Sequence, residues 1–231
     1  MISTASKFIN IHCHNQHSGN GWQLRSLDIS EIAANPLILS SQLIEQQTVS
    51  IGIHPWFIDR QTIEQSLRCM QALCEHANVI AIGECGLDKC IQTDLSIQMN
   101  VLNRQIDLSE RFDKPLIVHC VRAFNELLQL HKQLRPTRPW IVHGFVGKAP
   151  LAKQLVNHGL YLSFGKALLD QHSHAISALQ AIPLEQFFLE TDDSACEISE
   201  IYTATAKILD LDLPTLQRQL VANFERVFAH D

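Results

Sequence analysis

The chain has 231 residues, of which 46% are hydrophobic, and a formal net charge of −6. This length and apolar content suit one large core, so we expect a single domain over residues 1–231. An acidic chain lacks the charge balance of proteins that hold nucleic acid on a broad basic surface. Any phosphate-bearing substrate would therefore have to be held by a few local groups.

The seven cysteines are scattered and form no CxxC pair. The pattern therefore indicates neither a disulfide framework nor a zinc ribbon, and a reducing cytoplasmic location is expected. The sequence contains no run of about 18 apolar residues and no signal-peptide pattern, so neither a membrane span nor a membrane partner is expected.

Short apolar runs alternate with longer amphipathic stretches, which is the pattern of strands buried on both faces and covered by helices. Strands are expected at residues 8–11, 49–53, 79–83, 116–119, 140–143, 160–164 and 187–190. A further strand is expected at residues 22–27 or at residues 37–40, and the sequence does not choose between these two runs.

Helices are expected at residues 62–76, 96–111, 123–133, 149–158, 171–181, 197–209 and 214–228. In the second of them, Ile97, Val101, Ile106 and Leu108 are interleaved with charged residues, which predicts one face packed on a sheet. The alternation predicts an α/β fold, the (β/α)8 or TIM barrel. Because such barrels typically need about 250 residues, this one is expected to be compact.

Histidines and acids end several of the expected strands. In a barrel, side chains at the carboxyl ends of the strands converge on one mouth, where TIM-barrel enzymes keep their chemistry. His12 and His14 are two residues apart, so in a strand both point to the same side. The candidate metal ligands are His12, His14, Glu84, His119, His143 and Asp192.

Each of these histidines alone could equally be a core or rim residue. Together, the six ligands favour a metal site at the carboxyl ends of the strands, because an ionisable group after an apolar run is costly without a partner. Imidazole and carboxylate suit Zn²⁺, Mn²⁺, Fe²⁺, Co²⁺ or Ni²⁺ better than Mg²⁺ or Ca²⁺. Six ligands exceed the needs of one tetrahedral ion, so two ions bridged by Glu84 are expected.

Cys13, Cys85 and Cys120 each follow a candidate ligand by one position. Pleating directs them to the opposite side of the strand, so they are interpreted as buried packing residues.

Other residues are candidates for substrate binding. His54, in GIHPW, stands before a proline and can donate to a phosphate or carbonyl oxygen. It can equally be part of a structural turn. Arg122, Lys148 and Lys166 follow strand ends and can supply positive charge, although solvated residues of this kind are common.

The motifs HCH, GIHPW, AIGECGLDK, PLIVHC, HGFVGK, GLYLSFG, FLETDD and NFERVF occur in this order along nearly the whole chain. In this combination the chain resembles the TatD family of metal-dependent hydrolases. The resemblance implies an amidohydrolase-like TIM barrel that hydrolyses phosphodiesters, usually as a deoxyribonuclease. It also implies two divalent ions, chosen from Zn²⁺, Mn²⁺, Mg²⁺, Co²⁺ and Ni²⁺.

Carried over by motif, the resemblance implies that His12, His14, Glu84 and Asp192 hold one ion, and that Glu84, His119 and His143 hold the second. His54 would contact the scissile phosphate. Asp192 would orient or deprotonate the attacking water. Glu84, Asp192 and His54 are thus the expected catalytic residues, with His54, Arg122 and Lys148 binding substrate.

The chain departs from the family pattern outside these ligands. The first motif is HCHN instead of the common HxHLD, and Val121 replaces an arginine, with Arg122 one position later. Asp193 and Ser194 replace an alanine–proline pair, and the arginine-bearing loop that usually follows is missing. These differences lie where the family is expected to contact nucleic acid, so we expect strand ends or small phosphodiesters as substrates. We also expect the protein to be a monomer.

Two other functions remain open from the sequence. The same pair of ions can hydrolyse an ester or amide, such as a D-aminoacyl-tRNA or a cyclic amide. A non-catalytic metal-binding barrel is the second alternative, and the intact ligand set argues against it. Glu84 occupies the bridging position of the carbamylated lysine in many amidohydrolase-like relatives, which favours phosphodiester chemistry.

Overall fold

The computed structural model describes residues 8–14, 21–29, 32 and 47–228. The chain forms two compact units: Ser26–Trp140, called the central unit below, and Met1–Arg25 with Ile141–Asp231, called the terminal unit. Each unit is described by itself. The expectation of a single domain stays a prediction.

The sheet contains eight strands in chain order, β1 to β8. Their bounds are Ile9–Cys13 (β1), Trp22–Asp28 (β2), Val49–Gly52 (β3), Val79–Asp88 (β4), Leu116–Val121 (β5), Trp140–Val142 (β6), Tyr161–Phe164 (β7) and Phe187–Leu189 (β8). The described pairs are parallel, and within the terminal unit Cys13 of β1 bridges to Asp192 just after β8. This is the strand order of a (β/α)8 barrel, the fold expected from the sequence.

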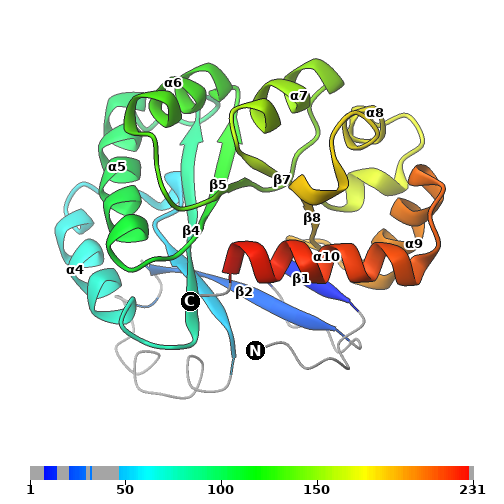
Figure 1. Cartoon of the computed structure of the whole chain (residues 1–231). Helices are drawn as coiled ribbons and strands as arrows, with labels where there is room; N and C mark the ends of the chain where they lie inside the picture. The colour runs from blue at the N-terminus through cyan, green and yellow to red at the C-terminus, as the bar shows by residue number, and fades with distance from the viewer. Residues whose placement is uncertain (1–7, 15–20, 30–31, 33–46, 229–231) are drawn as a thin grey trace. The chain divides into compact units, whose positions relative to one another are not determined.

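In the central unit, helices α4 (Ile63–Leu73), α5 (Leu95–Arg111) and α6 (Phe124–Leu134) lie side by side along β4 and β5 (Figure 1). Helix α5 buries Val101, Leu102 and Ile106 against the sheet. Burial of each such side chain contributes about 1.5–3 kcal/mol relative to exposure. The amphipathic pattern of the sequence therefore sets which face of α5 covers β4.

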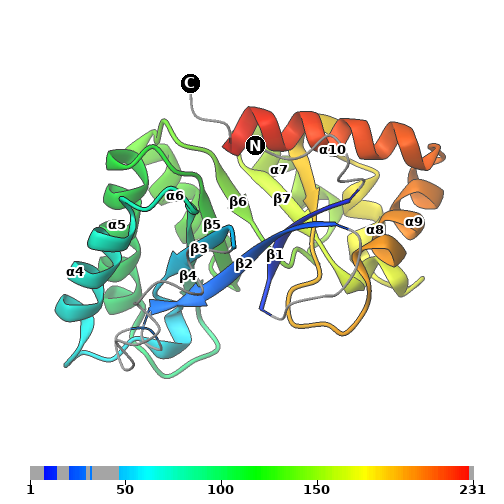
Figure 2. The ribbon, with the colours of Figure 1, turned by 90° about the horizontal axis from the view of Figure 1, so that it is seen from below.

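In the terminal unit, helices α7 (Ala149–Asn157), α8 (His174–Leu179), α9 (Ile198–Leu209) and α10 (Leu213–Phe228) accompany β6 to β8 and β1. Helix α10, red in Figure 2, contacts β8 and β1. The Tyr202 hydroxyl on α9 donates to the Ile9 carbonyl oxygen and accepts from the Ile9 N–H at 3.1 and 3.0 Å. These bonds fasten the beginning of β1 to the helical layer.

The prediction of a strand at residues 22–27 is confirmed by β2, whereas residues 37–40 lie outside the described part of the chain. The expected end of β4 at residue 83 is wrong, because β4 continues to Asp88. Gly86, with φ 150°, lies against the backbone of His119, where a Cβ atom would overlap. Gly86 therefore allows β4 to approach β5 closely.

The helix expected at residues 171–181 is confirmed but shorter, since α8 covers His174–Leu179. The Ser173 side chain accepts from the Ala175 N–H and starts the helix there. The 3₁₀ helix η2 (Lys166–Leu169) precedes it. The other helices and strands begin and end within about four residues of the expected bounds. Among the described residues, no helix is both long and apolar enough for a membrane span.

Candidate metal centre

In the terminal unit, the end of β1 and the segment after β8 bring three candidate ligands together. The Asp192 Oδ1 atom lies 3.6 Å from His12 Nε2 and 3.5 Å from His14 Nε2. Asp192 has a left-handed backbone with φ 54°, and its N–H donates to the His12 carbonyl oxygen at 3.0 Å. The His12 side chain is buried, whereas 44% of the His14 side chain is exposed. One histidine thus points into the core and the other towards solvent.

His143, directly after β6, joins this group. Its ring centroid lies 4.4 Å from that of His12. Its Nδ1 atom lies 3.5 Å from Oε1 of the fully buried Glu190, and the same oxygen accepts from the Gly144 N–H at 2.6 Å. Sequence reasoning missed Glu190, although it is the first acid of the ETD motif. Its position directly after an apolar strand could have identified it, because a buried carboxylate there needs hydrogen-bonding partners.

In the central unit, Glu84 of β4 lies between two histidines. Its Oε1 atom is 3.0 Å from His54 Nε2 and 3.0 Å from His119 Nδ1. His54 Nδ1 accepts from the backbone N–H of Trp56 at 3.1 Å, so the proton of the neutral ring belongs on Nε2. His54 thus begins a 3₁₀ turn, as expected if it is part of a structural turn, and its ring also faces Glu84.

Asp88, at the end of β4, was also missed. Its Oδ2 atom lies 3.3 Å from His119 Nε2 and accepts from the Trp56 indole N–H at 2.7 Å. Burial alone would raise the pKa of Asp88, but the hydrogen bonds from Trp56, Cys90 and His119 outweigh it and lower the pKa. A carboxylate that accepts a hydrogen bond from a metal-ligating histidine orients the imidazole ring and raises its basicity.

Two buried glutamines of α5 hold the strand ends that carry these groups. The Gln98 amide accepts from the Asp88 N–H at 2.7 Å and donates to the Asp88 carbonyl oxygen at 2.9 Å. Gln105 makes the matching pair of bonds with the backbone of Ile53, at 2.8 and 3.2 Å. The expected apolar face of this helix is therefore incomplete, because these polar side chains lie buried beside Val101 and Ile106.

The imidazoles and carboxylates of both clusters are donors of the kind that a divalent ion binds, except that His54 carries its proton on Nε2 and so faces Glu84 as a hydrogen-bond donor. The ligand atoms of His12, His143 and Asp192 lie within 4.8 Å of one another, and so do those of His54, Glu84 and His119. Around a metal with bonds of about 2.0–2.2 Å to nitrogen and oxygen, ligand atoms lie at such separations.

The cysteines beside the ligands do not add to this donor set. Burial raises the pKa of Cys13 to about 12 and that of Cys120 to about 12, which keeps both as thiols. The Sγ atom of the buried Cys85 lies 3.5 Å from the Ile117 carbonyl oxygen. These positions agree with their interpretation as packing residues.

Asp192 is the most strongly shifted carboxyl group of the terminal cluster. Burial alone would raise its pKa, but the hydrogen bonds from His12 and His14 outweigh this effect and hold its pKa well below the usual range. The side chain is one-third exposed. Asp192 is therefore an ionised carboxylate that a water molecule can reach.

The expected substrate-binding cations lie on the surface. Arg122, with a left-handed φ of 54°, follows β5, and Lys148 precedes α7; both are exposed. Lys166 pairs with Asp193 at 2.9 Å, so its charge is neutralised. Roles for Arg122 and Lys148, and the bridging role of Glu84, stay predictions.

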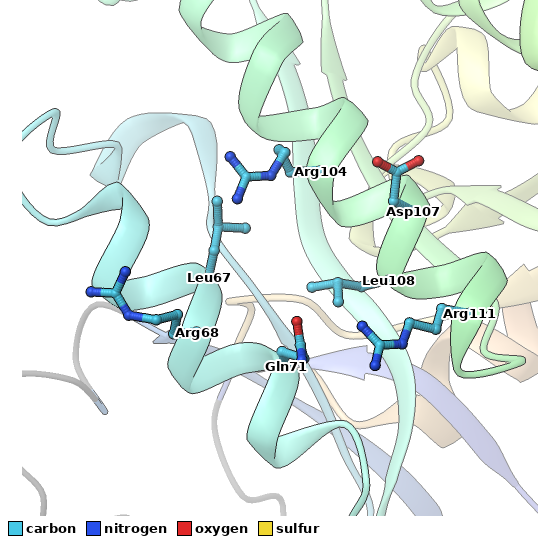
Figure 3. Close-up of a pocket in the computed structure, with 7 residues that line it drawn as sticks. All are labelled: Leu67, Arg68, Gln71, Arg104, Asp107, Leu108 and Arg111. Atoms are coloured by element: carbon cyan, nitrogen blue, oxygen red, sulfur yellow. The ribbon is translucent and has the colours of Figure 1, made fainter.

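A separate pocket lies between α4 and α5 of the central unit and contains none of the predicted site residues (Figure 3). Leu67 and Leu108 are buried at its floor, and the guanidinium groups of Arg68, Arg104 and Arg111 surround it. Arg104 pairs with Glu64 at 3.0 Å. Asp107 also lines the pocket, so the arginines there lie beside two carboxylates, those of Asp107 and Glu64.

Comparisons with known proteins agree with this geometry. A family model described as TatD related DNase matches residues 17–229. The human 3'-5' RNA nuclease TATDN2 is 35% identical over 163 residues, which are 67% of this chain and 21% of that protein. The uncharacterized metal-dependent hydrolase YjjV of Escherichia coli K12 is 30% identical over 147 residues, which are 62% of this chain and 56% of that protein. The chain thus spans about a fifth and about half of these two relatives.

The crystal structure of YjjV, a TatD homologue from Escherichia coli K12, has a TM-score of 0.84 to this chain at 22% identity. The match covers 99% of this chain and 100% of that chain. This likeness shows the barrel fold that the strand order indicates.

Proposed function

The chain belongs to the family of TatD-related DNases, and from this premise we propose that it is a metal-dependent phosphodiesterase, a deoxyribonuclease that trims DNA from strand ends. The observation that carries the proposal is the pairing of imidazoles with a carboxylate at strand ends in both units, around Asp192 and around Glu84. Such mixed donor sets are typical of hydrolytic metal sites.

The proposal includes two divalent ions, with Zn²⁺, Mn²⁺, Mg²⁺, Co²⁺ and Ni²⁺ as candidates. His12, His14, Glu84 and Asp192 would hold one ion, and Glu84, His119 and His143 the second, as the resemblance of the motifs implies. Bound divalent ions make water more acidic and stabilise the negative charge that develops on a phosphodiester under attack.

The side chains have separate tasks in this proposal. The ionised, partly exposed Asp192 can accept a hydrogen bond from the attacking water and orient it. His54 carries its proton on Nε2 because Nδ1 accepts from Trp56, and that proton can be donated to a phosphate oxygen. Asp88 fixes the ring of His119. Arg122 and Lys148 would contact the rest of the substrate.

We also propose that the protein works as a monomer in the cytoplasm. The support for a reducing compartment is that all seven cysteines are free thiols. Light scattering of the purified protein tests the oligomeric state.

The proposed activity is tested with chelator-treated protein reloaded with each candidate ion in turn. Single-stranded DNA, duplex DNA, RNA, a small phosphodiester and a D-aminoacyl-tRNA are the substrates. We expect metal-dependent release of nucleotides from strand ends. Deacylation of the aminoacyl-tRNA without any phosphodiester cleavage would overturn the proposal, and so would stoichiometric metal binding without hydrolysis of any phosphodiester.

A further inference from the structure

Two aromatic side chains stand exposed beside the Glu84 cluster. Trp56 and Phe57 belong to the 3₁₀ helix η1 (Pro55–Phe57), and they are 59% and 51% exposed. Single exposed apolar residues are ordinary, but large aromatic rings usually bury most of their surface. An adjacent pair beside a candidate catalytic cluster therefore suggests a binding surface.

Both rings contact the cluster directly. The Trp56 ring centroid lies 5.0 Å from that of His54 and 5.8 Å from that of His119. The Phe57 ring lies 5.5 Å from that of His54. Any planar group that rests on these rings would thus lie next to His54, the residue proposed to contact the phosphate.

The Trp56 ring is fixed in place although it is exposed. Its indole N–H donates to Asp88 Oδ2 at 2.7 Å, and its backbone N–H donates to His54 Nδ1 at 3.1 Å. The indole bond restricts the rotamer of the ring, and the backbone bond fixes the turn that carries it, before any ligand arrives. A preorganised ring loses less conformational entropy when it binds a partner.

We propose that Trp56 and Phe57 form a stacking platform for the unpaired nucleobase next to the scissile phosphodiester. The proposal rests on the proposed nuclease function and adds a selection for single-stranded ends. A nucleotide joins its base to its phosphate through one sugar, so a base on the platform leaves its phosphate beside His54. Every base has a flat π face, so the platform accepts all sequences.

A paired base can reach this platform only after it leaves its own stack in the duplex. Such unpairing costs free energy, and the cost is smallest at a single-stranded end. We therefore expect oligonucleotides with unpaired ends to bind more tightly than blunt duplexes. The substrate is then selected by the aromatic rings, without a broad basic surface, which agrees with the net charge of −6.

The test compares single-stranded oligonucleotides that differ only in the terminal nucleotide, which is normal or abasic, with a non-cleavable terminal linkage. Tryptophan fluorescence reports stacking, since Trp56 is exposed whereas Trp140 is buried and Trp22 is half-buried against Phe224. The Trp56→Phe variant assigns the signal to Trp56. We expect quenching with the normal oligonucleotide, its loss with the abasic one, and about 5- to 100-fold weaker binding of the abasic one. This comparison uses the unmodified protein, so the folding of a variant does not affect it.

Two variants locate the effect. Trp56→Phe should abolish the fluorescence change and retain part of the affinity, and Phe57→Leu should weaken binding of the normal oligonucleotide but not of the abasic one. Leu134→Ala is the matched control, because Leu134 is 46% exposed on another helix of the same unit, and it should behave like the parent protein.

The outcomes separate the two proposals. If the protein cleaves oligonucleotides and a base-free phosphodiester, yet normal and abasic oligonucleotides bind and quench alike, the platform is wrong and the nuclease function stands. If no phosphodiester is cleaved with any ion, the nuclease function fails. Binding of blunt duplexes as tight as that of single strands, or capture of a protein segment by the rings instead of a base, would also overturn the platform.

Discussion

Asn10 and Thr191, 181 residues apart in the chain, exchange two hydrogen bonds in the terminal unit. The Asn10 side-chain amide donates to Thr191 Oγ1 at 2.8 Å, and the Thr191 N–H donates to Asn10 Oδ1 at 3.0 Å. Both residues are fully buried. The pair therefore joins the strand that carries His12 to the segment that carries Asp192.

Replacing Asn10 by leucine should leave two buried polar groups of Thr191 without partners. Because each of the two unsatisfied buried groups costs about 1–3 kcal/mol, we expect a loss of about 2–6 kcal/mol in the free energy of unfolding. Urea denaturation measures it. The double variant Asn10→Leu with Thr191→Val should recover part of the loss, since the hydroxyl then needs no partner. Strict additivity of the two changes would contradict coupling between these residues.

Asp88→Asn should weaken metal binding without unfolding the protein. The asparagine retains the size and part of the hydrogen bonding to Trp56 and His119, but it removes the negative charge behind the His119 ring. Loss of such a partner typically costs about 10- to 100-fold in metal affinity or activity. Isothermal titration with the metal measures the change. Glu126→Gln, which alters the carboxylate of an ion pair with Lys89 near the surface, is the control.

Substitution of Glu84 and of His54 should have different effects on metal content and activity. Glu84→Ala is expected to lower both the metal content and the activity, since it removes the carboxylate between His54 and His119. His54→Ala should retain the metal and lose about 2–4 kcal/mol of transition-state stabilisation, the usual value of one donor to developing charge. Elemental analysis of the two variants separates these roles. Full metal content in Glu84→Ala, with a more damaging His54→Ala, would reverse the assignment.

The strand that ends before His143 was predictable from the sequence, because its apolar run stops where the polar residue begins. The strand expected to end at His119 is longer, since β5 continues to Val121. The strand β2 was ambiguous for a physical reason. It mixes buried Leu24 and Leu27 with half-buried Gln23 and Arg25, so its apolar run is interrupted. Its competitor, residues 37–40, begins with three consecutive apolar residues, Leu37, Ile38 and Leu39.

The partners of the ligands were not predictable from one sequence. Asp88 and Glu190 look like any acid at a strand end until their contacts to His119 and His143 are known. Gln98 and Gln105 are polar residues on the buried face of α5, where the pattern calls for apolar side chains. Only their bonds to the backbone of Asp88 and Ile53 explain why they are buried. These contacts join residues that are distant in the sequence, and the pattern of residue types along the chain does not show which of them meet.

Stability should depend on pH through Glu110 at the end of α5. Burial alone would raise its pKa, but hydrogen bonds from the Thr137 hydroxyl and the N–H groups of Thr137 and Arg138 outweigh it, so its pKa is lowered. A lowered folded-state pKa gives stability that is present above the unfolded value of about 4.3 and is lost as the pH falls through the folded-state pKa.

Glu110→Gln should therefore be less stable than the parent by about 1 kcal/mol near neutral pH, since hydrogen bonds to a charged group weaken. The difference should shrink towards zero as the pH falls below the folded-state pKa. Urea midpoints between about pH 3 and pH 7 measure this trend. Glu75→Gln, at an exposed position of the same unit, should show no such convergence. A difference that grows at low pH would contradict the direction of the shift.

Nucleic-acid binding should depend on the ions, because the protein alone has a formal net charge of −6. Two divalent ions would add about +4 of charge locally, so the metal-free protein should bind single-stranded DNA weakly and duplex DNA hardly at all. Fluorescence anisotropy of both forms at several salt concentrations tests this.

We expect the arginines around the pocket of Figure 3 to provide the remaining affinity of the metal-free protein for single-stranded DNA. Arg68→Gln with Arg111→Gln should then reduce the salt slope for single strands by about 1.4, since each phosphate contact contributes about 0.7. Leu134→Ala should leave that slope unchanged. Tight duplex binding by the metal-free double variant would show that charge outside this arginine cluster holds nucleic acid.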